Sequence, residues 1–439
     1  MVKNIKKFLI IIVLFVCAFA LSCGTPDDNG KHNNTKKENK YMLAEEEASF
    51  NFFWETQNTN PNLGGCGLIP DRYPSNGLAS IASVGFGLGA FVVGAHNNYI
   101  TKEEGLERTV LTLTHIKDLE RVNGFFFHFY QEKLGPKAHG TEVSNIDTAI
   151  FLCGALLAGE YFGGEAKTLA ESIYDEVNWT WFVNPTTKNF YMSYNADTKK
   201  FGGEWDTYAE HLMMFFLAAG SKTHPIEKAT YDAMKRHTGK YKGYTVINSW
   251  FGSIFTYQFS HAFIDFRYLT DDKGTNWFDN SVNATLAAYE YCQDNTDKFR
   301  TFAVDQWGVT ACDTPTGYSG LLGAMPSGTG MDMKFTNDGT IAPCGAIGSI
   351  VFAPDKVIPC INNYATLMDG DLVGVYGFYD AFNFEDNKPW IARNVIGIDK
   401  GITVLMIENY RSEIVWNTFM KLDFMDVAIE RLGFTKNEQ

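Results

Sequence analysis

The sequence predicts an all-α fold, an (α/α)6 barrel or toroid with long loops and a few short strands at one end. About twelve segments carry apolar residues at spacings of three and four, a period typical of helices with a buried face. Residues 41–439 contain no linker-like composition, so these segments belong to a single domain. Helix pairs wound into a closed ring satisfy both observations. The alternative, an open α-solenoid, would carry a regular repeat of roughly 34 to 47 residues, which the sequence lacks.

The predicted helices follow one another along the chain, separated by loops rich in Gly and aromatic residues. They are Leu43–Gln57, Leu78–Asn97, Lys102–Leu119, Ser144–Phe162, Ala166–Val177, Thr207–Ala219, Pro225–Arg236, Ser253–Leu269, Trp277–Asp294, Thr340–Val351, Asp355–Met368 and Glu413–Leu432. Strand-like stretches are short and rich in aromatic or β-branched residues: "FFFHFY" at 125–130, "FYMSY" at 190–194 and "ITVLMI" at 402–407. We expect the long loops to build a cleft at the open end of the ring.

The N-terminus has the pattern of a lipoprotein signal peptide, residues 1–22. Lys residues at 3, 6 and 7 precede "FLIIIVLFVCAFAL", an apolar stretch too short for a comfortable membrane span. The following "ALSC" resembles a bacterial lipobox and predicts lipidation of Cys23, although an ordinary secretory signal would also fit. Residues 23–40 are polar and predict a flexible tether. We therefore expect an extracytoplasmic lipoprotein in the periplasm or on the outer membrane of a Gram-negative bacterium, attached only through the lipid.

Composition narrows the class of function. The net charge of −14 gives no electrostatic footprint for nucleic acid. Aromatic residues make up 15% of the chain, which favours stacking on sugar rings. Six Cys follow residue 23 and show no Cys/His ligand spacing, so no metal or other cofactor is predicted. Cys153 lies in an apolar helix and is expected to be a buried free thiol.

Two acid clusters stand at predicted helix starts. The first is "HGTEVSNIDTAIFLCGAL", in which Glu142 and Asp147 precede an apolar helix and Ser144 with Asp147 has capping-box spacing. Helix capping alone would explain Asp147. In a helical ring, however, alternate helices point their N-termini to the same end, so a second acid cluster at another helix start would face this one.

The second cluster is "GEWDTYAE" at 203–210, which contains Glu204, Asp206 and Glu210. Thr207 with Glu210 again has capping-box spacing. Hydrolysis of a glycosidic bond needs one carboxylic acid and one carboxylate on opposite sides of the bond. Two facing clusters would supply such a pair.

Other loops offer candidate sugar-binding residues, each of which also has a structural reading. His261 with Asp265 at i+4 fits a polar pair on a helix. Trp307 and Trp390 lie in Gly/Pro/Asp-rich loops, where binding residues concentrate, and are candidate stacking platforms. The remaining loop candidates are Tyr318, Tyr379 and Arg393.

Several long motifs resemble one family. They are "YAEHLMMFFLAAGSKTHP" at 208–225, "FSHAFIDFRYLTDDKGTNWFDNSVNAT" at 259–285, "DGTIAPCGAIGSIVFAPD" at 338–355, "YGFYDAFN" at 376–383 and "GIDKGITVLMIENYRSEIVW" at 397–416. In this order they resemble the glucoamylase-like family of bacterial lipoproteins and secreted proteins, which includes the endo-β-1,2-glucanases of glycoside hydrolase family 144. The similarity runs from about residue 43 to the C-terminus.

The resemblance implies an (α/α)6 barrel that cleaves β-1,2-linked glucan with inversion and without a metal. Glu142 and Asp147 match the family pattern E-x-S-x-I-D-T-A. Tyr208 and Glu210 match an aromatic followed by the family's proton donor, so Glu210 is the expected general acid. Asp147 or Glu142 would then position or activate water. A departure from the family, Lys222 in place of Pro, lies outside this site.

Glu204, Asp206 and Tyr208 are secondary candidates for sugar contacts. Three functions remain open at this point: an endo-β-1,2-glucanase, an exo-acting β-glucosidase or glucoamylase-like hydrolase on another linkage, and a non-catalytic glycan-binding lipoprotein. Acids at both helix starts argue against the last, because a binder needs aromatic residues more than paired carboxylates. The expected partner is a glucan oligo- or polysaccharide, and the chain is expected to be a monomer.

Overall fold

The structure is a computed structural model that describes residues 39–328 and 335–437. These residues belong to one compact unit, Asn39–Gln439. The predicted signal peptide, the lipidation site Cys23 and nearly all of the predicted tether lie outside the described residues. Within the described part, none of the helices combines the length and the apolar character needed to cross a membrane.

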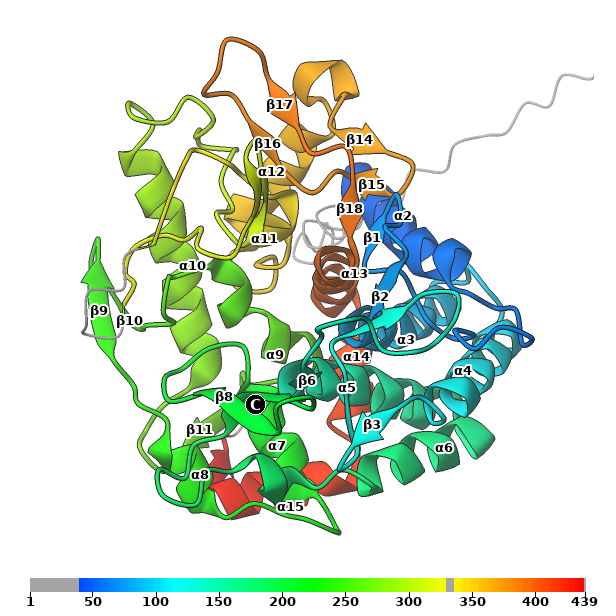
Figure 1. The fold of residues 1–439 in the computed structure, drawn as a ribbon. Coiled ribbons are helices and arrows are strands. Elements are labelled where there is room, and N and C mark those ends of the chain that lie inside the picture. Colours follow the sequence, from blue (N-terminus) through cyan, green and yellow to red (C-terminus); the bar gives the residue numbers. More distant parts are fainter. Residues whose placement is uncertain (1–38, 329–334, 438–439) are drawn as a thin grey trace, which may run out of the picture. The chain divides into compact units, whose positions relative to one another are not determined.

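The described helices form an inner and an outer layer (Figure 1). The inner helices are buried along almost their whole length: α3 (Ile81–His96), α5 (Asn145–Phe162), α7 (Leu212–Gly220), α9 (Phe259–Phe263), α11 (Pro343–Ile347) and α13 (Gly397–Arg411). The outer helices bury one face each: α2 (Lys40–Thr56), α4 (Lys102–Ile116), α6 (Gly164–Asp175), α8 (Lys228–Ala233), α10 (Trp277–Asp294) and α12 (Pro354–Tyr364). This alternation is the predicted (α/α)6 arrangement.

Contacts between the helices follow the ring. α3 packs against α5 and α13, and α11 also packs against α13. Two further helices complete the core: α14 (Ile414–Phe419) contacts α3, α5, α9 and α13, and α15 (Asp423–Leu432) covers α7. α13, seen nearly end-on in Figure 1, therefore has helical neighbours on several sides.

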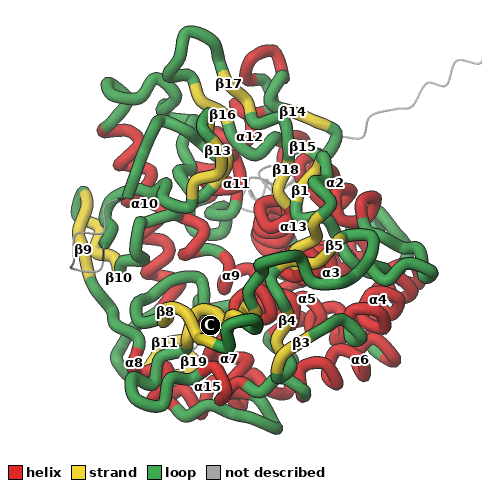
Figure 2. Tube along the Cα trace, viewed as in Figure 1, coloured by secondary structure: helices red, strands yellow, loops and turns green. Residues whose placement is uncertain are grey.

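The strands are short and lie in the loops that join the helices (Figure 2). They are β1 (Arg72–Tyr73), β2 (Leu78–Ser80), β3 (Arg121–Val122), β4 (Phe125–Phe126), β5 (Phe129–Gln131), β6 (Val143–Ser144), β7 (Tyr191–Asn195), β8 (Lys200–Glu204), β9 (Thr238–Tyr241), β10 (Tyr244–Ile247), β11 (Leu269–Asp271), β12 (Cys312–Thr314), β13 (Gly317–Ser319), β14 (Val373–Gly374), β15 (Gly377–Phe378), β16 (Phe382–Asn383), β17 (Trp390–Ile391), β18 (Val395–Ile396) and β19 (Phe434–Lys436).

Three of these strands run directly into inner helices: β2 into α3, β6 into α5 and β18 into α13. Their partners are β5, β7 and β1 respectively, all antiparallel. Strand pairing therefore fixes the backbone just before the N-termini of these three helices.

The glycines at the crossing of α3 and α5 explain how closely the inner helices approach. A Cβ atom at Gly154 would lie 1.8 Å from the carbonyl oxygen of Gly85. A Cβ at Gly85 would lie 2.5 Å from the carbonyl oxygen of Ile150. No larger side chain fits at either position without moving a backbone, so these glycines set the distance between the two helices.

Four sequence predictions about helices are wrong. Ser253–Leu269 is not one helix, because it holds a short 3-10 helix, Ile254–Tyr257, and α9, and then leaves the helical conformation before β11. Glu413–Leu432 is divided into α14 and α15, which are separated by residues 420–422. "ITVLMI" at 402–407 is not a strand but the middle of α13; all six residues are buried and five are apolar, so this short run alone does not distinguish a helix from a buried strand. The helix predicted from Thr207 begins only at Leu212, so Thr207 does not cap it. By contrast, the Ser144 hydroxyl does cap α5, because it accepts a hydrogen bond of 3.2 Å from the Asp147 amide.

Candidate active site

A cavity of about 440 Å³ opens where the starts of α5, α9 and α13 meet the turn before α7. We call it the central cleft. Its apolar walls are Phe129, Ile146, Ile150, Phe255, Phe259, Ile396 and Ile398. Its polar residues are Asp71, Arg72, His128, Asp147, Glu210 and Tyr318. The two acid clusters predicted from sequence thus each contribute a carboxyl group to one cavity.

Glu210 lies in the turn before α7 and is partly buried among apolar walls. Its carbonyl oxygen accepts a hydrogen bond of 2.5 Å from the Ser260 hydroxyl, which fixes this turn against α9. Burial raises the pKa of Glu210 from its ordinary value of 4.5 to about 7, and the negative charge of Asp147 adds to the rise. A carboxyl group that keeps its proton near neutral pH can serve as a general acid.

Asp147 lies in the first turn of α5 with both carboxylate oxygens engaged. Oδ2 accepts a hydrogen bond of 2.5 Å from the Ser144 hydroxyl, and Oδ1 lies 3.7 Å from Nε2 of His128. The opposite ring nitrogen of His128, Nδ1, lies 2.9 Å from Oε1 of Glu142. His128 therefore bridges the two acids of the first cluster.

The positive charge of His128 and the negative charges of Asp147 and Glu142 stabilise one another. Burial opposes a charged imidazole, but the carboxylates of Asp147 and Glu142 outweigh it and raise the pKa of His128 to about 9. The hydrogen bond from His128 in turn lowers the pKa of Glu142. Asp147 lines the cleft, whereas Glu142 is not among the lining residues and is more exposed, at 40% against 14% of the side chain. The geometry therefore favours Asp147 over Glu142 as the acid that faces a substrate.

Asp71 and Arg72 also line the central cleft, although neither is among the site residues predicted from the sequence. Burial raises the pKa of Asp71, while the guanidinium of Arg72, 3.6 Å away, opposes the rise. Arg72 also binds Asp313 at 3.1 Å. The signal for these residues was weak, since "PDRYP" reads as a turn. His128 was a stronger signal, as the one histidine in the aromatic run "FFFHFY".

A buried acid pair lies beside the cleft at the start of α13. Asp380 and Asp399 are both almost completely buried. Burial raises the pKa of Asp399 to about 6 and raises the pKa of Asp380 well above its ordinary value, an effect that the negative charge of Asp399 increases. Oδ2 of Asp380 accepts a hydrogen bond of 2.8 Å from the Asp313 amide, so the pair also holds the strand that carries the partner of Arg72.

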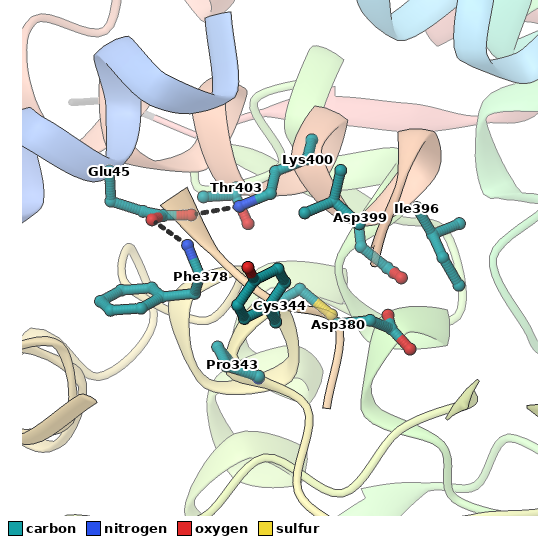
Figure 3. Close-up of a pocket in the computed structure, with 11 residues that line it drawn as sticks. Glu45, Pro343, Cys344, Phe378, Asp380, Ile396, Asp399, Lys400 and Thr403 are labelled. Atoms are coloured by element: carbon teal, nitrogen blue, oxygen red, sulfur yellow. Dashed lines mark hydrogen bonds and ion pairs between the residues drawn. The ribbon is translucent and has the colours of Figure 1, made fainter. Parts of the chain in front are cut away.

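A buried ion pair joins this region to the outer layer (Figure 3). Glu45 of α2 accepts hydrogen bonds from Nζ of Lys400 and from the Phe378 amide, each 2.7 Å long. Glu45 and Lys400 are both nearly inaccessible to solvent. Separating α13 from α2 would leave the charges of Glu45 and Lys400 without partners, which is costly for buried groups. This contact therefore fixes α13 against α2.

Three predicted sugar-binding residues are core residues instead. Tyr208, His261 and Trp307 are each 1% exposed. Tyr208 stacks on Trp277 with ring centroids 4.7 Å apart. Burial lowers the pKa of His261 to about 3, and its Nε2 lies 2.9 Å from the Ser281 hydroxyl. The predictions that these three residues contact sugar are wrong, because each side chain is enclosed in the core.

The predicted pairing of His261 with Asp265 is also wrong. α9 ends at Phe263, so the two residues do not share a helix. Asp265 instead binds Arg267 at 2.8 Å, and Arg267 also binds Glu413 at 2.8 Å.

Glu204 and Asp206 do not line the central cleft. Glu204 accepts hydrogen bonds from Asn184 at 2.5 Å and Asn189 at 3.1 Å, and therefore organises the loop before β7. Asp206 pairs with Lys235 at 2.8 Å. Both acids have structural partners, and the prediction that they contact sugar has no support in this geometry.

The last four predicted residues lie nearer to the cleft. Tyr318 lines the central cleft and is 53% exposed. Trp390 and Arg393 line an adjoining cavity that also includes Tyr318. Tyr379 lines neither cavity and packs against the guanidinium of Arg393, 5.4 Å from its ring centroid.

The cysteines do not contribute to the site. Each Cys in the described residues is buried and free, including Cys153 as predicted.

A family model and a curated relative match this chain. The family model, described as "Putative glucoamylase", matches residues 203–423. An exo beta-1,2-glucooligosaccharide sophorohydrolase (non-reducing end) from Parabacteroides distasonis is 26% identical over 433 residues, which cover 89% of this chain and 57% of that protein. The chain thus spans little more than half the length of this curated relative.

Solved structures match the fold closely. An endo-β-1,2-glucanase from Chitinophaga pinensis, solved with sophorotriose and glucose, has a TM-score of 0.80 at 26% identity, covering 90% of this chain and 98% of that chain. A protein from Bacteroides uniformis with the same description as the family model has a TM-score of 0.80 at 25% identity, covering 90% and 97%. The predicted (α/α)6 fold is confirmed. Because the family model matches half of the sequence, the chain belongs to this glucoamylase-like family.

Proposed function

We propose that this chain is a glycoside hydrolase that cleaves β-1,2-linked glucan. The observation that carries the proposal is the central cleft, in which Glu210, with a pKa raised to about 7, shares one cavity with Asp147. An acid that holds its proton and a second carboxylate are the two groups that glycosidic hydrolysis requires. The linkage is supported by the relatives from Parabacteroides and Chitinophaga, whose names specify β-1,2-linked substrates.

In the proposed reaction, Glu210 donates its proton to the glycosidic oxygen as the bond from that oxygen to the anomeric carbon breaks. Asp147 orients or deprotonates the water that attacks the anomeric carbon. His128, held by Glu142, keeps Asp147 in position and offsets its charge. We expect inversion, which requires a carboxyl separation of about 6.5–9.5 Å with room for that water.

Endo action is the proposed mode, and exo action is the alternative. The endo mode is supported by the cavity that continues from the central cleft past Tyr318, since a chain cut internally needs room on both sides of the bond. The exo mode is supported by the name of the Parabacteroides relative, a longer protein than this chain.

The test is digestion of linear β-1,2-glucan, with β-1,3- and β-1,4-glucans as linkage controls and the Glu210→Gln variant as the inactive control. Oligosaccharides of several lengths from the β-1,2-glucan alone are expected. A single short product would indicate exo action. Products from another glucan alone would refute the linkage, and no product from any glucan would refute hydrolysis. Proton NMR of the first anomer formed decides between inversion and retention.

We also propose that the chain is anchored through a lipid on Cys23 and functions as a monomer. The basic start, the apolar stretch and "ALSC" support the anchor. Metabolic labelling of the full chain with palmitate should mark the wild-type protein and not the Cys23→Ala variant. Equal labelling of both would refute the anchor, and a mass well above 49.2 kDa by light scattering would refute the monomer.

A further inference from the structure

A second cavity adjoins the central cleft and shares two of its residues. This outer groove has a volume of about 510 Å³ and lies between the β12–β13 hairpin and the segment from Trp390 to Asn394. Arg72 and Tyr318 line both the groove and the central cleft. The two cavities are therefore parts of one longer path, and the path passes the side chain of Tyr318.

The outer groove combines aromatic rings with planar polar groups. Tyr318, at the centre of β13, is 53% exposed, and Trp390 of β17 is partly exposed beside Arg393. A glucose ring presents apolar C–H faces, which pack on aromatic rings, and hydroxyl groups, which pair with guanidinium, amide and carboxylate groups. Sites for small polar ligands generally combine such surfaces. This composition fits a sugar chain better than a purely apolar or a purely charged ligand.

A hydrogen-bond network centred on Asp313 connects the groove to the cleft. Oδ2 of Asp313 accepts bonds from Nη1 of Arg72 at 3.1 Å and from Nδ2 of Asn394 at 2.7 Å. Asp313 is itself held by the hydrogen bond that its backbone N–H donates to Oδ2 of Asp380. Arg72 remains one-quarter exposed, so its guanidinium can also contact a ligand. These hydrogen bonds hold the side chains of Arg72, Asp313 and Asn394 in place before any ligand binds, which reduces the entropy lost on binding.

We propose that the outer groove binds glucosyl units of the same glucan chain beyond the bond presented to Glu210, and that Tyr318 sets the position of the chain between the two cavities. This inference rests on the proposed function and extends it. Substrates long enough to reach Trp390 should bind more tightly than short ones.

The binding test uses the Glu210→Gln variant as the parent, so that binding is measured without turnover. The probes are β-1,2-linked glucotriose and a chain of about eight glucosyl units, titrated calorimetrically. Adding Trp390→Ala should weaken binding of the longer chain about tenfold and reduce the advantage of the longer chain over the trisaccharide. Trp390→Phe should recover most of that loss. The matched control is Tyr268→Ala, which removes an aromatic ring from a different groove. Unchanged binding of the longer chain by the Trp390→Ala variant would overturn the proposal.

A turnover test separates this inference from the proposed function. In the active enzyme, Tyr318→Ala should change the distribution of product lengths from linear β-1,2-glucan. If wild-type protein cleaves the glucan but neither substitution changes product lengths or the dependence of kcat/KM on chain length, the groove proposal is wrong and hydrolysis stands. If the Glu210→Gln protein binds the long chain through Trp390 but wild-type protein releases no product, hydrolysis is wrong and the groove stands.

Discussion

Replacement of Glu210 by Gln tests the assigned general acid, because Gln keeps the size of the side chain and cannot donate a proton. A positioned general acid accelerates a reaction by about 10²–10⁴-fold. We therefore expect kcat on β-1,2-glucan to fall at least about 100-fold with a smaller change in KM. In the wild-type enzyme, activity should decline as pH rises above about 7, where Glu210 loses its proton.

The same substitution should change the pH dependence of stability. The folded protein raises the pKa of Glu210 from 4.5 to about 7, so between these values the unfolded chain releases a proton that the folded chain retains. Stability therefore falls as pH rises through this window. The loss is about 3.5 kcal/mol at most, since one pKa unit corresponds to about 1.4 kcal/mol. Gln carries no charge, so the variant should gain stability relative to wild type as pH rises from 4 to 8.

Chemical unfolding of both proteins across this pH range measures the difference directly. Glu107→Gln is a suitable control, because Glu107 is an exposed carboxylate on α4. A stability difference between Glu210→Gln and wild type that stays constant with pH would refute the raised pKa of Glu210. Retention of wild-type kcat by the variant would refute the catalytic role.

Asp147→Asn should lower kcat about 100-fold with little change in KM, and a loss below tenfold in steady-state assays would count against its role. Glu142→Gln should lower kcat less than Asp147→Asn does, since Glu142 acts through His128. A larger loss of kcat in Glu142→Gln would reverse the assignment of the two acids. His128→Gln should shift the acidic limb of the pH–rate profile to higher pH, because the carboxylates lose their positive partner; an unmoved limb would contradict this. Gly154→Ala should lower the free energy of unfolding by about 1–3 kcal/mol in denaturant titrations, and an unchanged value would show that α3 and α5 can separate at Gly85.

The sequence was sufficient to predict the helical ring and the meeting of two acid clusters. Apolar spacing identified the helices that bury one face, such as α4 and α10, because one side of each meets solvent. It failed at α13, where the six-residue run "ITVLMI" is buried throughout and has the composition of a strand, so that it was not recognised as part of a longer helix. Ser144 was correctly predicted as a cap, whereas the same spacing at Thr207 was misleading because the chain before α7 makes a turn that presents Glu210 to the cleft.

Binding residues were harder to predict than the acids. Trp307 and Trp390 both lie in Gly/Pro/Asp-rich loops, yet one is 1% exposed and the other lines the outer groove. Local composition does not determine which loop is covered by neighbours distant in sequence. Asp71 and Arg72 were missed for the same reason, since they reach the cleft only because β1 pairs with β18, more than 300 residues later in the chain.

A crystal structure of the Glu210→Gln variant with a β-1,2-linked gluco-oligosaccharide bound tests whether Glu210 and Asp147 act on the same glycosidic bond. In the expected arrangement, the side chain of residue 210 lies within about 2.6–3.2 Å of one glycosidic oxygen, with Asp147 and a water molecule on the opposite face of the sugar that is cleaved. An oligosaccharide that binds away from the central cleft, or one in the cleft with both side chains out of reach of the same linkage, would contradict it.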